Sequence, residues 1–240
     1  MRLTRLLLVL TLLAISAHLA LAGDIVAMPT GNMMPAKTLS LGYIYWNTEA
    51  ISTPAGKVRD FMNVGEVFVG VTDRLELDYL VIQPQGWGKV ANDSVLHELN
   101  LYYQAINERP GKHPSLVVGA TNLTANNWLP SKGRPNPAVG DDRISPFALA
   151  AYTIRTPVAG PPTWVDPVMR LHLGWGSGWH DNIWFGAAQV MWTPEIGMAI
   201  LNYQGQPAYL GAWMPLPGLE IHGGWDHGEA LGHVAYSQPF

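Results

Sequence analysis

Apolar and polar residues alternate with a period of two along most of the chain. In DRLELDYLVIQ (73–83), apolar or aromatic side chains occupy the odd positions from 75 to 81, and charged side chains occupy the even positions from 74 to 78. The stretches HELNLYYQA, VMRLHLGW and GLEIHGGWD repeat the pattern. Alternation of this kind is typical of β-strands, because a helix would place apolar residues three and four positions apart. The pattern therefore predicts an all-β protein.

The alternating stretches predict about twelve strands. They cover residues 37–47, 58–71, 74–84, 95–106, 114–123, 146–155, 167–176, 182–192, 196–204, 207–215, 218–226 and 229–240. Many of these strands approach the roughly 9–11 residues that a tilted strand needs to cross a membrane. Strands of soluble sandwiches commonly have about five or six residues. The strand lengths therefore favour a membrane barrel over a soluble sandwich.

The predicted connections support the same architecture. The second connection is the tight turn Thr72-Asp73, whereas the third and fifth are long, at 85–94 and 124–145. Bacterial outer-membrane barrels combine short periplasmic turns at even connections with longer outer loops at odd ones. The fourth and sixth connections depart from this rule, because they are long for turns. We expect a single antiparallel transmembrane β-barrel.

The first 22 residues have the layout of a secretory signal peptide. Two arginines precede an apolar run at 6–15, and Ala-Leu-Ala at 20–22 is a small-residue cleavage site. An N-terminal membrane anchor is the alternative, although the apolar run is short for a span. We therefore expect a cleaved signal peptide at 1–22 and one outer-membrane β-barrel domain at 23–240.

The composition indicates the compartment of the protein and the class of partner to expect. The chain has no cysteine, which favours a bacterial envelope protein, since secreted eukaryotic domains often carry disulfides. Charged residues make up 13% of the chain, which is roughly half the usual share. The net charge of −4 gives no reason to expect a nucleic-acid partner. Most Trp and Tyr residues fall near predicted strand ends, where membrane barrels carry aromatic girdles.

The chain ends in GHVAYSQPF, an alternating run in which Gly232, Val234, Tyr236 and Phe240 share a face. This ending resembles the last strand of bacterial outer-membrane barrels, whose terminal Phe is read by the barrel assembly machinery. The resemblance implies that these four residues form the assembly signal, and that outer-membrane lipids and the assembly machinery are partners. The sequence departs from the usual pattern at Gln238, where an apolar or aromatic residue is common.

A second resemblance covers about a quarter of the chain. FMNVGEVFVGVTDRLELDYLVI (61–82) and PSLVVGATNL (114–123) are similar to hairpins of bacterial outer-membrane barrels, among them the YjbH-like proteins. That group is associated with exopolysaccharide production, so the resemblance implies an outer-membrane barrel and raises polysaccharide as a partner.

Polar side chains on the second face of the predicted strands would point into the barrel, because lipid-facing and lumen-facing residues alternate. The side chains predicted to face the lumen are Arg74, Glu76, Asp78, Glu98, Asn100, Gln104, Arg170, His172, Glu220, His222, Asp226 and His233. Acids and bases are mixed in this set, which favours a balanced network filling a small barrel over a strongly ion-selective ring. A narrow polar pore and a site for a small polar ligand are the functional alternatives.

Other chemistry has weaker support. His222 and His233 face the same side of neighbouring strands and are ligand types for divalent metals, but their spacing is not diagnostic. Ser177 lies close to His180 in GWGSGWHDN (174–182), but the glycine spacing is not that of a nucleophile elbow. We therefore expect no metal, no cofactor and no catalytic residue.

The sequence predicts a non-catalytic β-barrel of the outer membrane of a Gram-negative bacterium. Its expected role is that of a structural or accessory protein of the cell envelope, or of a narrow, porin-like passive pore for small solutes. The segment 124–145 could fold into the lumen as a plug. The alternatives are a soluble periplasmic or secreted β-barrel that binds a small ligand, and an envelope lipid hydrolase.

Overall fold

The fold consists of β-strands joined by turns and loops. The computed structural model describes residues 31, 33–47, 51–53, 56–58, 61–85, 95–109, 111–124, 144–155, 168–177, 183–193, 195–203, 206–226 and 229–240. Within these ranges the strands are β1 (Thr38–Asn47), β2 (Ile51–Thr53), β3 (Gly56–Val58), β4 (Phe61–Thr72), β5 (Leu75–Gln85), β6 (Leu96–Ile106), β7 (Ser115–Thr121), β8 (Ser145–Arg155), β9 (Val168–Gly176), β10 (Ile183–Met191), β11 (Ile196–Tyr203), β12 (Gln206–Leu216), β13 (Leu219–Asp226) and β14 (Glu229–Pro239). No helix occurs among the residues so described.

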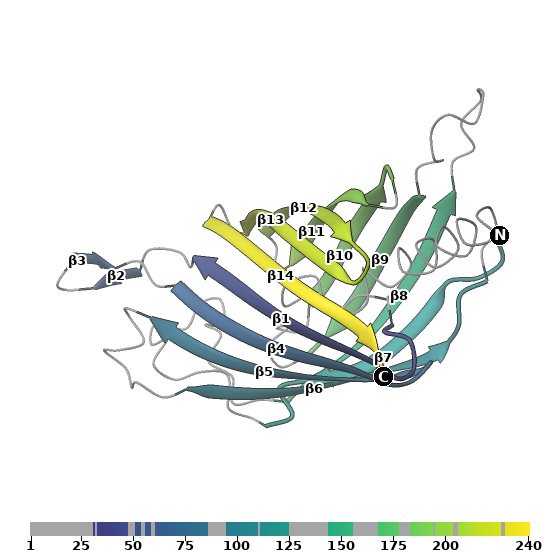
Figure 1. Ribbon diagram of the computed structural model, residues 1–240, viewed down its shortest axis with the longest axis horizontal. Helices are drawn as coiled ribbons and strands as arrows, with labels where there is room; N and C mark the ends of the chain where they lie inside the picture. The colour runs from purple at the N-terminus through teal and green to yellow at the C-terminus, as the bar shows by residue number, and fades with distance from the viewer. Residues whose placement is uncertain are drawn as a thin grey trace, which may run out of the picture.

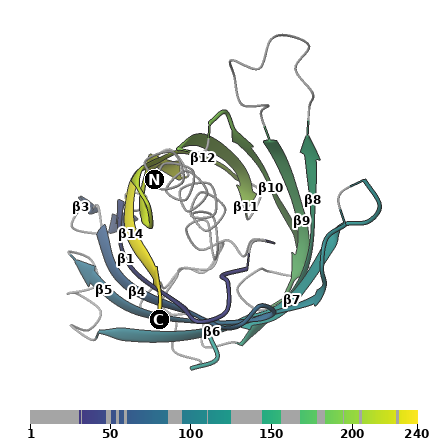
Figure 2. The same ribbon diagram turned by 45° about the vertical axis from the view of Figure 1, so that its right-hand side comes forward.

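Twelve of the strands form one closed antiparallel barrel, and β2 and β3 form a separate two-stranded sheet (Figure 1). The strands from β4 to β14 follow one another around the barrel in chain order. β1 pairs with β4 on one side and with β14 on the other. The pairing with β14 runs from Thr38–Pro239 to Trp46–Leu231. The β1–β14 pairing is the closing seam, and Figure 2 shows the curved wall that it completes. The prediction of an all-β, antiparallel, twelve-strand barrel is confirmed.

The predicted boundaries of the barrel strands lie within about three residues of the observed ones, because alternation with one buried face specifies a strand and its register together. The sequence pattern missed the hairpin of β2 and β3, which lies in the connection between β1 and β4. Strands of three residues are too short to show an alternation. The predicted signal peptide at 1–22 and most of the predicted plug at 124–145 lie outside the described residues.

Buried and exposed side chains alternate along the barrel strands, so one face of each strand points inward and the other outward. All acidic and basic side chains described within the barrel strands, His97 excepted, belong to the inward face. They are Glu66, Glu76, Asp78, Glu98, Arg170, His172, Glu220, His222 and His233. The outward face is apolar and aromatic, with exposed fractions of 54% at Leu41, 57% at Leu173 and 67% at Trp184.

Most aromatic side chains on the outward face lie toward the ends of the strands, and Tyr43 and Tyr79 lie nearer the middle. Those toward one end are Tyr45, Trp175, Trp184 and Trp225, and those toward the other end are Tyr103, Trp213 and Tyr236, with Trp192 just beyond β10. Outward apolar residues such as Leu77, Leu101 and Ile200 lie between the two groups. The barrel wall therefore has an apolar middle with aromatic margins.

The interior is divided along the barrel axis. We call the end at which β1 begins and β14 finishes the terminal end, and the opposite end the loop end. A cluster of buried apolar side chains, including Phe147, Phe185 and Leu231, lies mostly toward the loop end. Most of the buried carboxylates and histidines lie at mid-height or toward the terminal end. The polar groups of the interior therefore lie mainly between mid-height and the terminal end, whereas Glu98 lies toward the loop end.

Two adjacent glycines of β13, Gly223 and Gly224, differ in how closely neighbouring atoms approach them. A Cβ added at Gly224 would lie 1.9 Å from the backbone oxygen of Tyr209 on β12, whereas a Cβ added at Gly223 would meet nothing within 4 Å. We expect Gly224→Ala to lower the free energy of unfolding by about 1–3 kcal/mol, because the two strands must move apart. Gly223→Ala should leave it unchanged or slightly raised. The temperature at which the purified barrel loses its compact band on an unheated gel measures both. Equal effects of the two substitutions would contradict the observed approach of the strands.

Candidate functional site

The structure brings most of the predicted lumen set together on the inner wall. Eight of these side chains are buried inside the barrel: Glu76, Asp78, Glu98, Asn100, His172, Glu220, His222 and His233. Gln104 and Arg170 are half-buried at the terminal end. Arg74 differs from the prediction, because it lies in the turn between β4 and β5 and is exposed. The backbone of Asp226 ends β13, and its side chain lies outside the described part.

A short piece of chain before β1 lies inside the barrel, where the sequence pattern gave no signal. We call Gly31 and residues 33–36 the lumen segment, which Figure 2 shows in purple, running across the inside of the wall. The N–H of Gly31 donates to Nδ1 of His172 on β9 (3.0 Å), and the N–H of Met34 donates to Glu76 Oε2 on β5 (2.7 Å). The segment thus links the inner faces of β9 and β5, which are not neighbours in the barrel.

The fit of the lumen segment is close at Gly31. A Cβ added there would lie 2.2 Å from the Cβ of Ala151, an inward-facing residue of β8. His172 accepts a hydrogen bond at Nδ1, so its proton is on Nε2, which donates to Gln189 Oε1 on β10 (2.9 Å). His172 is therefore a neutral imidazole that links the segment to two strands.

Arg170 is the centre of the network that holds this segment. Its Nη1 donates to Glu108 Oε2 (2.7 Å) and to Thr153 Oγ1 (2.8 Å), and its Nη2 donates to the backbone oxygen of Gly31 (2.9 Å). Glu108 also accepts hydrogen bonds from the N–H and the hydroxyl of Thr153. The guanidinium therefore joins β9, β8, the β6–β7 connection and the lumen segment.

A second polar group lies on β5 and β6. Asp78 Oδ2 accepts from Asn100 Nδ2 (2.9 Å), and Asn100 Oδ1 accepts from the N–H of Asn122 (2.9 Å). Glu76 lies on the same face of β5 as Asp78, and Glu98 lies on β6 opposite Leu80. All of these polar side chains are buried.

A third group, which we call the seam row, comprises Glu220, His222, His233 and Glu66. His222 Nε2 lies 2.6 Å from Glu220 Oε1, and the Nδ1 atoms of His222 and His233 lie 3.1 Å apart. His233 Nε2 lies 2.6 Å from Glu66 Oε1. The row is continuous across β13, β14 and β4. The prediction that His222 and His233 face the same side of neighbouring strands is confirmed.

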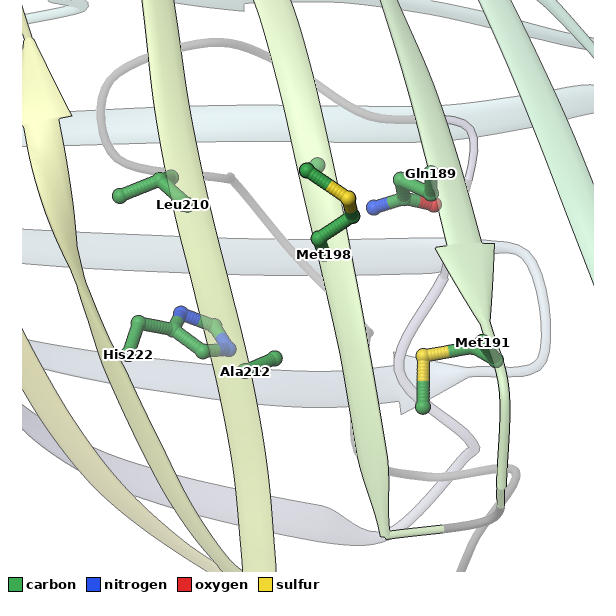
Figure 3. Close-up of a pocket in the computed structure, with 7 residues that line it drawn as sticks. Gln189, Met191, Met198, Leu210, Ala212 and His222 are labelled. Atoms are coloured by element: carbon green, nitrogen blue, oxygen red, sulfur yellow. The ribbon is translucent and has the colours of Figure 1, made fainter.

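A small pocket lies beside the seam row, on the inner wall of β10 to β13 (Figure 3). Gln189 and His222 are its polar lining, and the remainder is Met191, Met198, Ala199, Leu210 and Ala212. The pocket offers little hydrogen-bonding capacity and therefore little selectivity for a polar ligand.

Carboxylates outnumber guanidinium groups on the described part of the inner wall. On the described part of the inner wall there are five carboxylates, Glu66, Glu76, Asp78, Glu98 and Glu220, and one guanidinium, that of Arg170. Glu66 is not in the set predicted to face the lumen, although it alternates with apolar residues in NVGEVFVG. Arg74 is in the predicted set as a lumen cation, but the structure places this residue in the turn between β4 and β5.

Of the candidate catalytic pair Ser177 and His180, only Ser177 lies in the described part of the chain. The N–H of Ser177 donates to the backbone oxygen of Pro146 (3.0 Å), and His180 lies outside the described residues. No group of three or more His, Asp or Glu side chains in the described ranges is arranged to hold a metal ion. The described residues also contain no helix long and apolar enough to cross a membrane.

No model of a known protein family and no curated protein matches this sequence.

Arg170 and Arg74 make a matched pair for testing the network. Arg170→Met should lower the free energy of unfolding by about 3 kcal/mol, because it leaves the Glu108 carboxylate without its cation in a largely buried position. Arg74→Met should change it by less than about 0.5 kcal/mol, because Arg74 is exposed. Denaturant unfolding followed by tryptophan fluorescence measures both. The assignment of Arg170 as the centre of the network fails if the two effects are alike.

Proposed function

We propose that the chain is a β-barrel of the bacterial outer membrane. The observation that carries the proposal is the distribution of charge: the described acidic and basic side chains of the barrel strands point inward except His97, and the outward face is apolar with aromatic margins. A wall of this kind suits lipid, because a charged side chain on a lipid-facing position costs roughly 2–4 kcal/mol at mid-membrane. Closure of the sheet serves the same purpose, since a spanning sheet can leave no backbone group unpaired in lipid.

The proposed role is non-catalytic, as an accessory protein of the envelope or as a narrow passive pore. The lumen segment supports a narrow passage, because it lies inside the barrel, where Arg170, His172 and Glu76 bind it. The excess of carboxylates over guanidinium on the inner wall favours small cations over anions if the barrel conducts. A link to exopolysaccharide production rests on the resemblance of 61–82 and 114–123 alone.

Delivery to the membrane would follow the usual bacterial route. A signal peptide at 1–22 would direct export, and the last strand would then be read by the assembly machinery. In the structure this strand is β14, with Val234, Tyr236 and Phe240 exposed on the outward face or at the chain end. Phe240 is 70% exposed and its N–H donates to the backbone oxygen of Lys37, so its side chain is available to a partner.

The first experiment is fractionation combined with gel migration before and after boiling. We expect the mature chain in the outer-membrane fraction, with a compact band that shifts only on boiling. Recovery in the soluble fraction without detergent would contradict the proposal and favour the soluble, ligand-binding barrel. Hydrolysis of phospholipid or lipid A by the purified barrel would favour the envelope hydrolase instead.

Charged substitutions of Leu77 on β5 and of Gln104 on β6 distinguish the outward face of the wall from the inward face. Leu77→Arg places a charge on the outward face and should abolish the heat-modifiable band, at a cost of roughly 2–4 kcal/mol at mid-membrane. Gln104→Arg is the control, because Gln104 is a half-buried polar residue on the inward face of β6, so the new charge does not replace an apolar side chain of the core. The amount of folded barrel in outer-membrane fractions measures both. Equal tolerance of the two charges would contradict a lipid-facing outer wall.

A further inference from the structure

The lumen segment has a near end, which continues into β1, and a far end at Gly31. The N–H of Ala36 donates to Asp73 Oδ1 in the turn between β4 and β5 (3.1 Å), and the N–H of Lys37 donates to the backbone oxygen of Gly70 on β4 (2.7 Å). A Cβ added at Gly70 would lie 1.9 Å from the backbone oxygen of Pro35. The near end therefore lies directly on the wall and is fixed by the strand that follows it.

The far end is held through the backbone of Gly31. Its N–H donates to His172 Nδ1 (3.0 Å), and its carbonyl oxygen accepts from Arg170 Nη2 (2.9 Å). Arg170 and His172 are two residues apart on β9, so both side chains project from the same face of that strand. Two neighbouring side chains of the inner wall thus bind both polar groups of one peptide residue.

The space around this residue fits glycine. A Cβ added at Gly31 would lie 2.2 Å from the Cβ of Ala151 on β8, a distance at which one of the two atoms must move. The next atoms, the Cα of Ala151 and Nη2 of Arg170, are each 3.5 Å away, which is an ordinary contact. The methyl group of Ala151 is therefore the atom that excludes a larger residue at position 31.

The two side chains that bind Gly31 are oriented by other parts of the barrel. Arg170 Nη1 donates to Glu108 Oε2 (2.7 Å) and to Thr153 Oγ1 (2.8 Å), and His172 Nε2 pairs with Gln189 Oε1 (2.9 Å). None of these contacts involves the lumen segment. Side chains that are fixed by a second set of partners form a preorganised binding site. The inner wall therefore holds these groups in place for the peptide that they bind.

The width of the interior gives the segment its importance. Barrels of about eight strands are filled by their own side chains, whereas barrels of about 16–18 strands leave an aqueous channel. A barrel of twelve strands lies between these sizes. Met34, in the middle of the lumen segment, is only 2% exposed, so the segment is packed into the interior. It takes up space that would otherwise belong to the passage.

We propose that Gly31 is a latch: the inner wall of β8 and β9 is a glycine-selective site for a peptide backbone, and the chain's own Gly31 occupies it. While the latch is closed, the lumen segment stays on the wall and narrows the passage. When Gly31 leaves the site, the far end moves away while the near end remains attached to β1, and the passage widens. The latch needs only the closed barrel, whereas its effect on conduction rests on the proposed outer-membrane pore.

The reactivity of a cysteine at position 34 measures the latch, because the chain has no cysteine of its own. Met34→Cys in the full-length barrel should react slowly with a water-soluble maleimide, since position 34 is buried. Adding Gly31→Ala should raise the rate by about tenfold or more, because the overlap with Ala151 opens the far end. Gly65→Ala is the control and should keep the slow rate, because a Cβ added at Gly65 meets nothing within 4 Å.

A compensating substitution tests the cause of the release. In the double variant Gly31→Ala/Ala151→Gly the excluding methyl group is absent, so the cysteine at position 34 should again react slowly. Equal rates with and without Gly31→Ala, or a rate that stays fast in the double variant, would overturn the latch. If Gly31→Ala gives no compact band on an unheated gel, Ala151→Val makes the same test from the wall side, because it enlarges the side chain that faces Gly31.

Planar-bilayer conductance of the same variants tests the effect on the passage. We expect a larger single-channel conductance for Gly31→Ala than for the wild type, and the wild-type conductance for the double variant. Equal conductance in all three, with labelling rates in the expected order, would show that the segment does not set the width of the passage. If no variant conducts, the passive pore of the proposed function is wrong. The labelling rates then still decide the latch, in a membrane or in solution.

Discussion

Closure of the sheet is the constraint on which the rest of this structure depends. An unpaired strand edge exposes a row of backbone N–H and C=O groups, each of which costs free energy wherever water cannot reach it. Here the first barrel strand must therefore pair on both sides, with β4 and with β14. Closure also fixes the direction of every side chain, because alternate residues must point into a confined interior or away from it.

The confined interior determines how the charged residues are held. A buried carboxylate needs donors, and the inner wall has few cationic side chains to provide them. The structure uses other donors instead: the amide of Asn100 for Asp78, the backbone N–H of Met34 for Glu76, and an imidazole for Glu66. The lumen segment is thus part of the same hydrogen-bonding network, since its backbone N–H groups bind His172 and Glu76.

The sequence predicts the wall of the barrel far better than its contents. Alternation such as that of 73–83 identifies a strand and its inward face, so the sequence alone places Glu76, Asp78 and His172 on the inside. Contacts across the interior leave no such period. The approach of Glu66 to His233 joins residues 167 positions apart, and it becomes visible only when the seam is closed. Gly31 and Met34 precede the first strand, and no pattern in GNMMPA (31–36) predicts that they lie inside the barrel.

The position of the lumen segment also constrains the order of folding. Gly31 is bound by Arg170 and His172, which follow it by 139 and 141 residues. Contacts of such long sequence separation form late, because most of the intervening chain must be in place first. The start of the described chain therefore waits for β9 before it can settle, although β1, which directly follows it, is needed for the final pairing with β14. Completion of the wall and filling of the interior are thereby linked in time, so that a barrel that closes too early would leave the lumen segment outside.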